Sequence, residues 1–110
     1  PRIVHSLLFS RYGAGMSYGR HTDNALMGGA NFYRSDVSFT VFLSEPEAYE
    51  GGELVIEGAD SERPYKLAAG SAIVYPSTTL HRVEPVVQGD RTVCVGWVQS
   101  LVRDAAQREI

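Results

Sequence analysis

The chain has 110 residues, 44% hydrophobic and 21% charged, which suits one folded domain rather than a disordered segment. A formal net charge of −3 without any cluster of basic side chains argues against nucleic acid as the main partner, because phosphate binding needs concentrated positive charge. No apolar stretch approaches the roughly 20 residues needed to cross a bilayer. The single cysteine, Cys94, fits a reducing compartment, so we expect a cytoplasmic protein without membrane attachment.

Short strand-like runs separated by turn residues follow one another along the chain. We expect strands at 3–10, 18–23, 36–43, 53–57, 65–67, 72–75, 81–86 and 91–98, a Gly-rich loop through 28–29 and a hairpin loop at 58–64. Only the tail, 100–108, has a weak helical stripe. This pattern predicts an all-β fold of two packed sheets, a jelly roll (double-stranded β-helix) with a short C-terminal helix. Another β-sandwich or an open barrel is the alternative that the pattern leaves open.

The most regular alternation lies at 36–43. One face carries the apolar residues Val37, Phe39, Val41 and Leu43, and the other carries Asp36, Ser38, Thr40 and Phe42. The start of the chain is also informative, because Pro1 leads at once into a strand. We therefore expect a single jelly-roll catalytic core over 1–110 that is an excerpt of a longer protein.

Three residues form a candidate metal-binding set. His21 and Asp23 are two apart, so on an extended strand both side chains point to one face. The short motif is weak by itself, since two polar residues on a surface strand are common. His81 strengthens it, because two imidazoles and one carboxylate on one face of an octahedron are typical of non-haem iron(II) oxygenases. Zinc is the alternative metal for these ligand types.

Arg91 is the candidate for binding an acid beside that metal. It follows His81 by ten residues, and Pro85 and Gly89 lie between them, so we expect the chain to turn and Arg91 to begin an adjacent antiparallel strand. Its guanidinium would then bind the far carboxylate of a 2-oxo acid through paired hydrogen bonds. A surface arginine beside Asp90 is the ordinary alternative for Arg91 taken alone.

Several stretches together resemble a known family. They are 11–24, 34–44, 51–54, 69–70, 75–77, 80–83, 89–91 and 96–100, which span nearly the whole chain. The sequence resembles the prolyl-4-hydroxylase-like branch of the 2-oxoglutarate/Fe(II)-dependent dioxygenases, and within it the bacterial PKHD-type hydroxylases. The resemblance implies a jelly roll with Fe(II) at its open end. It also implies O2 and 2-oxoglutarate as co-substrates, hydroxylation of an unidentified second substrate with release of succinate and CO2, and ascorbate as a reductant.

The resemblance also assigns roles to individual residues. His21, Asp23 and His81 match the iron ligands, Arg91 matches the 2-oxoglutarate anchor, and Tyr12 matches a tyrosine that lines the pocket. Phe42 departs from the pattern, because eukaryotic relatives often have a hydrogen-bonding tyrosine there. Thr40 or Ser38, on the same face, would substitute through a hydroxyl. On the last strand, Arg91, Val93, Val95 and Trp97 would share the inward face, and Trp97 would wall the iron pocket.

The second substrate and the partners are less defined. Tyr18, Asn24 and Arg34 flank the metal motif and are candidates for substrate contact, although roles in surface turns are equally compatible with their positions. Family members have further sequence that covers one sheet, so we expect the apolar face of 37–43 to be covered by a second copy or by flanking sequence. The alternative function is a cupin-like metal-binding jelly roll, a sensor or binding module without oxygenase activity. An inactive interaction domain is a further alternative.

Overall fold

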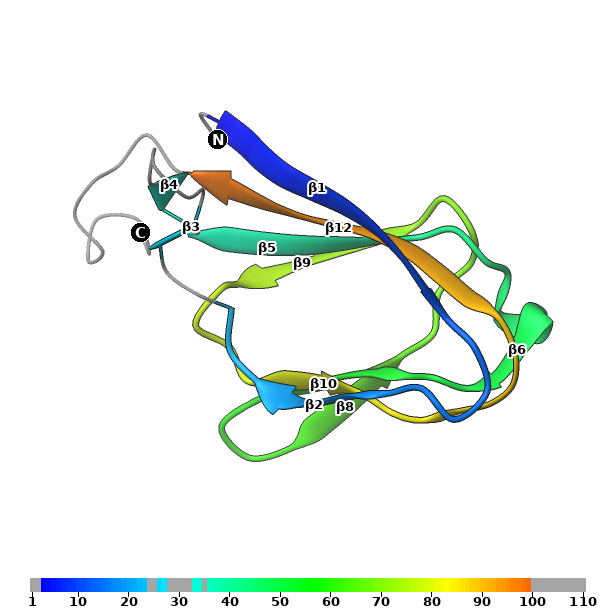
Figure 1. Cartoon of the computed structure of the whole chain (residues 1–110). Helices are drawn as coiled ribbons and strands as arrows, with labels where there is room; N and C mark the ends of the chain where they lie inside the picture. Colours follow the sequence, from blue (N-terminus) through cyan, green and yellow to red (C-terminus); the bar gives the residue numbers. More distant parts are fainter. Residues whose placement is uncertain (1–2, 24–25, 28–32, 35, 100–110) are drawn as a thin grey trace.

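The computed structural model describes residues 3–23, 26–27, 33–34 and 36–99, and these form strands arranged in two main sheets. Sheet I has the order β1 (Ile3–Tyr12), β12 (Arg91–Gln99), β5 (Val37–Phe42) and β9 (Ala72–Pro76). Sheet II has the order β2 (Tyr18–His21), β10 (His81–Val83), β7 (Leu54–Glu57) and β8 (Glu62–Tyr65). Figure 1 shows the two sheets as facing layers.

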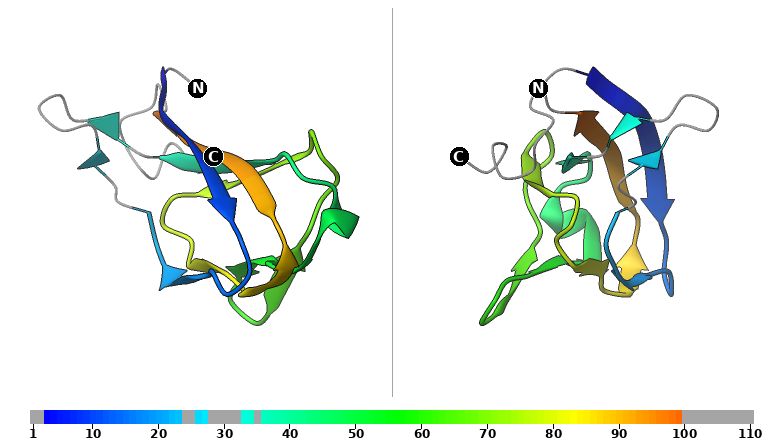
Figure 2. Two further views of the ribbon diagram at one scale, coloured as in Figure 1. Left: turned by 45° about the vertical axis from the view of Figure 1, so that its right-hand side comes forward. Right: turned by 90° about the vertical axis from the view of Figure 1, so that its left-hand side faces the viewer.

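Two short ribbons and one turn of 3-10 helix complete the described chain. β6 (Tyr49–Gly51) pairs with β11 (Val86–Gly89), and β3 (Leu26–Met27) pairs with β4 (Tyr33–Arg34). The 3-10 turn, η1 (Pro46–Ala48), precedes β6. All the strand pairings are antiparallel, and the chain crosses repeatedly from one sheet to the other (Figure 2). The predicted all-β jelly roll is therefore confirmed.

Some predicted boundaries were wrong. Residues 62–64 belong to β8, so the turn after β7 is shorter than the expected loop at 58–64, and the strand expected at 65–67 begins earlier. Proline at position 64 is more typical of a loop than of a strand. However, β8 is an edge strand of sheet II, where a residue without an N–H is tolerated. The predicted helix at 100–108 and the loop at 28–29 lie outside the described residues. Within those residues, no helix has the length and hydropathy of a membrane span.

The alternation of β5 places its polar residues inside the molecule. Ser38, Thr40 and Phe42 are 1%, 2% and 1% exposed and face sheet II. In antiparallel register they lie opposite Trp97, Val95 and Val93 of β12, so the two strands present one common inner face. That face carries polar groups where a purely structural core would carry aliphatic side chains.

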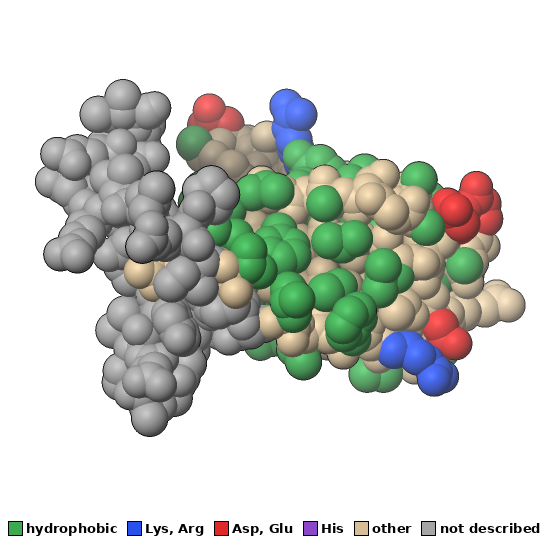
Figure 3. Space-filling view, turned by 90° about the horizontal axis from the view of Figure 1, so that it is seen from above, with side chains coloured by type: hydrophobic (Ala, Val, Ile, Leu, Met, Phe, Trp, Pro, Cys, Tyr) green, Lys and Arg blue, Asp and Glu red, His purple; other side chains and the backbone are tan. Residues whose placement is uncertain are grey.

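The outer face of sheet I is apolar and exposed. Leu7, Phe9 and Val74 are 58%, 72% and 63% exposed, and hydrophobic side chains gather over this face in Figure 3. Gly96 lies among them, and a Cβ there would come within 2.4 Å of the Phe39 ring and 2.8 Å of Leu7. The predicted apolar residues of β5 lie on this side, but Val37, Phe39 and Val41 are half-buried, and only Leu43, just after the strand, is exposed, at 42%.

Gly89 allows the chain to turn tightly just before β12 begins at Arg91. It has φ of 82°, a left-handed conformation that L side chains rarely adopt, and a Cβ would lie 2.2 Å from the carbonyl oxygen of Ala48. Glycine therefore allows β11 to pack closely beside β6 and then to turn, so that Arg91 starts β12 opposite Tyr12 of β1.

Candidate metal centre and adjoining cavity

The pairing of β2 with β10 brings two histidines together. His21 is the last residue of β2, His81 is the first of β10, and the two are direct partners in the antiparallel register. Opposite residues point to the same face, so both imidazoles project from sheet II toward sheet I. Asp23 follows two residues later, where its N–H donates to the Ser77 carbonyl at 3.1 Å.

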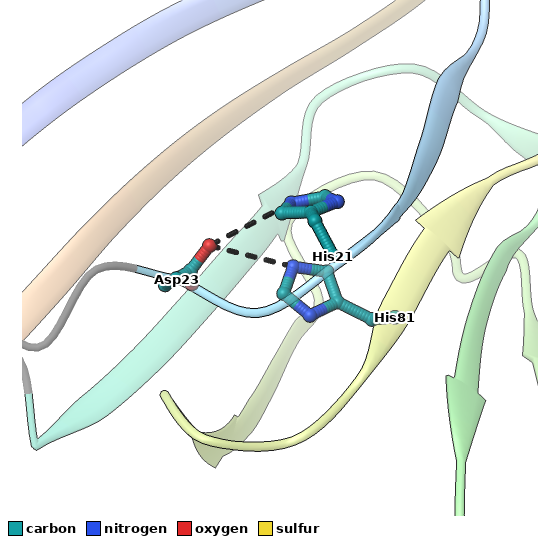
Figure 4. Close-up of side chains that lie close together, drawn as sticks. All are labelled: His21, Asp23 and His81. Carbon is teal, nitrogen blue, oxygen red and sulfur yellow. Dashed lines mark ion pairs between the residues drawn. The ribbon is translucent and has the colours of Figure 1, made fainter.

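The three side chains converge on one point (Figure 4). Asp23 Oδ1 lies 3.7 Å from His21 Nε2 and 3.5 Å from His81 Nε2, and one ligand atom from each residue lies within 4.8 Å of the others. His81 and Asp23 are nearly covered, with side chains 5% and 11% exposed, and His21 is 25% exposed. The convergence predicted from the sequence is confirmed.

Backbone carbonyls orient both imidazoles. His21 Nδ1 lies 2.6 Å from the Gly19 carbonyl oxygen, and His81 Nδ1 lies 2.9 Å from that of Thr79. A carbonyl only accepts hydrogen bonds, so each Nδ1 carries the proton and donates it. In the neutral tautomer each Nε2 then presents a lone pair toward Asp23, which is the arrangement that a metal-ligating histidine needs.

The second oxygen of Asp23 is occupied by protein donors. Ser38 Oγ donates to Oδ2, and Trp97 Nε1 donates to the same atom at 3.0 Å. Burial raises the pKa of Asp23, but hydrogen bonds from Ser38, from Trp97 and from His81 when its ring is protonated outweigh it and lower the pKa to about 2. Burial lowers the pKa of His81, yet its bonds to Asp23 and Thr79 raise it above its ordinary value. The site therefore attracts positive charge, as a proton or as a cation.

A cavity of about 340 Å³ extends from these three residues to Arg91. Apolar residues from both sheets line much of its wall, including Leu54, Val83, Val93 and Val95. Such a volume is at the lower end of the range for small-molecule sites. The candidate metal-binding set and the predicted acid-binding residue therefore line one cavity.

Arg91 is a buried cation that lacks an acidic partner. It is 2% exposed, and no carboxylate pairs with it among the residues that the structure describes. Its Nε has no hydrogen-bond partner, and its guanidinium lies 5.2 Å from the Tyr12 ring centre and 5.9 Å from that of Phe42. Burial lowers the pKa of Arg91, although Tyr49 and Tyr12 partly oppose this. An unpaired buried charge is costly, so the cavity is suited to an anion.

Three hydroxyl groups lie in or near the cavity, those of Thr40, Tyr75 and Tyr49. Thr40 Oγ1 lies 3.5 Å from the Tyr75 hydroxyl, and both residues line the cavity. The Tyr49 hydroxyl is buried near Arg91 but makes no hydrogen bond of good geometry. Sequence reasoning anticipated Thr40 but missed Tyr75 and Tyr49. Alternation along 72–75 was the available signal for Tyr75, whereas Tyr49 comes from a short ribbon that no periodicity indicated.

The remaining predicted residues lie around the mouth of the cavity or outside the described chain. Tyr18 is 52% exposed and stacks on His21, with ring centroids 4.0 Å apart. Tyr12 and Trp97 line the cavity, as expected. Ser38, considered as a substitute hydroxyl near Arg91, is instead bonded to Asp23. Asn24 lies outside the described residues, and Arg34 is described only by its backbone in β4.

Comparison with known proteins identifies the family. Residues 7–99 match the model of the 2OG-Fe(II) oxygenase superfamily. The chain belongs to this superfamily. It is 72% identical over 110 residues to a PKHD-type hydroxylase of Gloeothece citriformis, a match that covers 100% of this chain and 50% of the relative. The chain thus spans about half the length of the curated relatives it matches.

Two solved structures are similar to this chain. A Pseudomonas putida prolyl-4-hydroxylase superposes with a TM-score of 0.70 at 29% identity, covering 84% of this chain and 51% of that protein. A cupin domain from Bordetella pertussis superposes with a TM-score of 0.56 at 15% identity, covering 86% of this chain and 80% of that one. The cupin likeness shows a shared jelly-roll fold and nothing about activity.

The residues present fit the groups that membership in the 2OG-Fe(II) oxygenase superfamily implies, namely Fe(II) and 2-oxoglutarate. The donor set of two imidazoles and one carboxylate suits Fe(II). The buried, unpaired guanidinium of Arg91 suits the far carboxylate of a dicarboxylic acid.

Proposed function

We propose that the protein is an Fe(II)- and 2-oxoglutarate-dependent dioxygenase that hydroxylates a second substrate with release of succinate and CO2. The single observation that carries this proposal is the coexistence of two features in one cavity. One is the convergent set His21, Asp23 and His81, and the other is the buried Arg91 without an acidic partner. A metal-binding module without oxygenase activity has no need for the second feature.

His21 Nε2, His81 Nε2 and Asp23 Oδ1 would hold Fe(II). The three residues line the same cavity as Arg91, so a cation held by them would share this space with an acid bound to Arg91. With 2-oxoglutarate and O2 bound, the iron centre supplies the oxidising chemistry, in which decarboxylation to succinate accompanies insertion of oxygen into a C–H bond of the substrate. The protein contributes position and charge: the Gly19 and Thr79 carbonyls fix the two imidazole rings, and the near-covered Asp23 remains ionised.

Arg91 would bind the remote carboxylate of 2-oxoglutarate with paired hydrogen bonds. Thr40 and Tyr75 supply hydroxyls on the same wall and compensate for Phe42, which has no polar atom to offer. Tyr12 packs its ring against the guanidinium and helps to fix it. The apolar wall excludes water around this pair, which strengthens the attraction between the guanidinium and the acid.

The site does not identify the second substrate, but the position of Tyr18 suggests how a substrate would approach the metal. This exposed ring stacks on the exposed side of His21, so a substrate that approaches the metal would pass it. Trp97 would close the opposite wall beside Asp23. The predicted contributions of Asn24 and Arg34 stay predictions. A protein or peptide side chain and a small metabolite are both compatible with the described mouth.

The test is 2-oxoglutarate turnover, measured as succinate and CO2 in the presence of Fe(II), with ascorbate as a reductant. We expect turnover in the parent protein and its loss in Arg91→Ala, while anaerobic titration shows that Arg91→Ala still binds iron. Arg11→Ala is the matched control, because Arg11 lies on the neighbouring strand with a side chain 72% exposed. Iron binding without turnover in the parent protein would favour the cupin-like alternative, and absence of iron binding would favour an inactive interaction domain.

The proposal also covers location and association. The single cysteine, which is buried, supports the expected cytoplasmic location. The exposed apolar face of sheet I, with Leu7, Phe9 and Val74, supports the expectation that a second copy or flanking sequence covers it. Light scattering at several concentrations tests self-association, and a strictly monomeric species would refute the second copy.

A further inference from the structure

The two oxygens of the Asp23 carboxylate have different surroundings. Oδ1 faces the two imidazoles, with His81 Nε2 at 3.5 Å and His21 Nε2 at 3.7 Å. Oδ2 faces sheet I, where Ser38 Oγ and Trp97 Nε1 both donate to it. The donors come from β5 and β12, whereas Asp23 follows β2 of sheet II. One sheet therefore carries the carboxylate and the other sheet fixes its orientation.

Ser77 completes a directed chain of hydrogen bonds. Ser77 Oγ and Ser38 Oγ are 2.9 Å apart, and by distance alone either could be the donor. Ser38 has one hydroxyl proton, and an ionised carboxylate only accepts, so this proton points to Asp23. Ser77 must then donate to Ser38. Consecutive hydrogen bonds in one direction polarise and strengthen each other, so Ser77 makes Ser38 a better donor.

These serines have no evident packing reason for being polar. Ser38 and Ser77 are each 1% exposed, and burying a hydroxyl is unfavourable unless it is hydrogen-bonded. Alanine has nearly the same volume and would fill both positions without that cost. Ser38 therefore acts on the carboxylate that it contacts, and Ser77 acts on the same carboxylate through Ser38.

We propose that Ser38 and Trp97, supported by Ser77, are positioning residues that hold Asp23 as a one-oxygen ligand and keep Oδ2 away from the metal. This inference rests on the proposed function. A carboxylate with both oxygens free binds a cation through one or both of them. Two donors on Oδ2 occupy its lone pairs and turn it away, so Asp23 fills one coordination position and leaves the others for 2-oxoglutarate and O2.

The test uses Co(II), which substitutes for Fe(II) without turnover and reports its coordination through its visible absorption spectrum. The variants are Ser38→Ala, Trp97→Phe, Ser77→Ala and the double variant Ser38→Ala/Trp97→Phe. Loss of outer contacts to a ligand typically weakens metal binding by roughly 10–100-fold. We expect about tenfold for each of the first two, less for Ser77→Ala because it acts through Ser38, and the largest loss for the double variant.

Two further readouts separate positioning from simple destabilisation. The Co(II) spectrum of the double variant should change, because Oδ2 is free to join the metal. Its affinity for 2-oxoglutarate should also fall, although Arg91 is untouched. Ser44→Ala is the matched control: this serine also loses two hydrogen bonds, to Thr92 N–H and the Asp90 carbonyl, but lies outside the cavity lining. It should keep the parent affinity and spectrum.

The outcomes are distinguishable. Variants that match Ser44→Ala within twofold in Co(II) affinity and share the parent spectrum would overturn the positioning roles but leave the metal centre standing. A parent protein that fails to bind Co(II) would overturn the proposed function and this inference together. Melting of the metal-free proteins shows whether each variant is folded, and Trp97→Phe, which keeps an aromatic ring, tests the inference independently of Ser38→Ala.

Discussion

Replacing Arg91 with methionine should separate stability from ligand binding. Arg91 is 2% exposed and unpaired with any acid in the described chain, so the fold without ligand bears the cost of a buried charge. Methionine fills similar volume without charge. Exchanging buried ionic groups for apolar ones is often neutral or stabilising, by about 1–4 kcal/mol. For a chain of this size, about 1 kcal/mol corresponds to a melting shift of roughly 4–8 °C.

The same substitution should abolish the effect of 2-oxoglutarate. In the parent, the acid at 100 times its Kd adds about 2.7 kcal/mol of stability through binding to the folded state. Each charge-assisted hydrogen bond to Arg91 contributes about 1.5–3 kcal/mol, so loss of a pair weakens binding by roughly 100-fold or more. At the same ligand concentration, Arg91→Met should show almost no ligand-induced rise in melting temperature.

The assay is thermal melting with Mn(II), with and without 2-oxoglutarate, under anaerobic conditions. Arg91→Met should melt at or above the parent temperature without the acid, and adding the acid should raise the melting temperature of the parent but not that of the variant. Arg11→Met is the control, because the Arg11 side chain is 72% exposed and should change neither value. A variant that melts lower without 2-oxoglutarate yet keeps the full ligand shift would refute the assignment of Arg91 as an unpaired cation reserved for the acid.

Three further predictions concern the metal, the backbone and the apolar face. The pKa of His81 is raised in the metal-free site, so a proton competes there with the cation. The Co(II) affinity, measured by titration, should fall by roughly tenfold per pH unit once the pH drops below that raised pKa, because one proton must leave. An affinity that does not change with pH would contradict this. Gly89→Ala should lower the free energy of unfolding in urea much more than Gly70→Ala. Both residues have positive φ, but only at Gly89 would the added Cβ meet backbone atoms within 4 Å, the nearest being the Ala48 oxygen. Equal losses in the two variants would refute the close approach. Phe9→Ser should change unfolding by less than about 0.5 kcal/mol, because Phe9 is 72% exposed, while reducing any concentration-dependent association in light scattering. A large loss of stability would show that the chain itself covers this ring.

The features of the site that depend on residues close together in the sequence were predictable from the sequence. The spacing of His21 and Asp23 indicated a shared face, and the alternation along 91–97 correctly placed Arg91 and Trp97 on the inner side of one strand. Gly89 was also expected to lead into the strand of Arg91, but the expected adjacency of this strand to that of His81 was wrong, because β12 lies in sheet I and β10 in sheet II. These inferences depend only on the two-residue period of a strand and on turn chemistry.

The contacts between sheets were beyond the sequence pattern. The direct pairing of His21 with His81 depends on the long-range register of β2 and β10. The meeting of Ser38 and Trp97 at Asp23 depends on how sheet I lies over sheet II. Ser38 was expected near Arg91 instead, because periodicity fixes the face of a residue but not its neighbour across the cavity. The strand at Pro64 was missed for a related reason. Proline is tolerated in an edge strand, and the sequence alone does not show that β8 lies at the edge of its sheet.

The Asp23 carboxylate lies between the two sheets. The imidazoles of His21 and His81 in sheet II face one of its oxygens, and Ser38 and Trp97 of sheet I donate hydrogen bonds to the other. His21 ends β2, Asp23 follows it and His81 begins β10, so a cation at this point ties two strands of sheet II together, whereas Ser38 and Trp97 link it to sheet I only through hydrogen bonds. Opening motions that separate β2 from β10 must then break coordination as well as the pairing of the strands. Backbone amides of these two strands therefore exchange with deuterium more slowly once the centre is loaded, whereas those of the distant β6–β11 ribbon keep their rates (Figure 1).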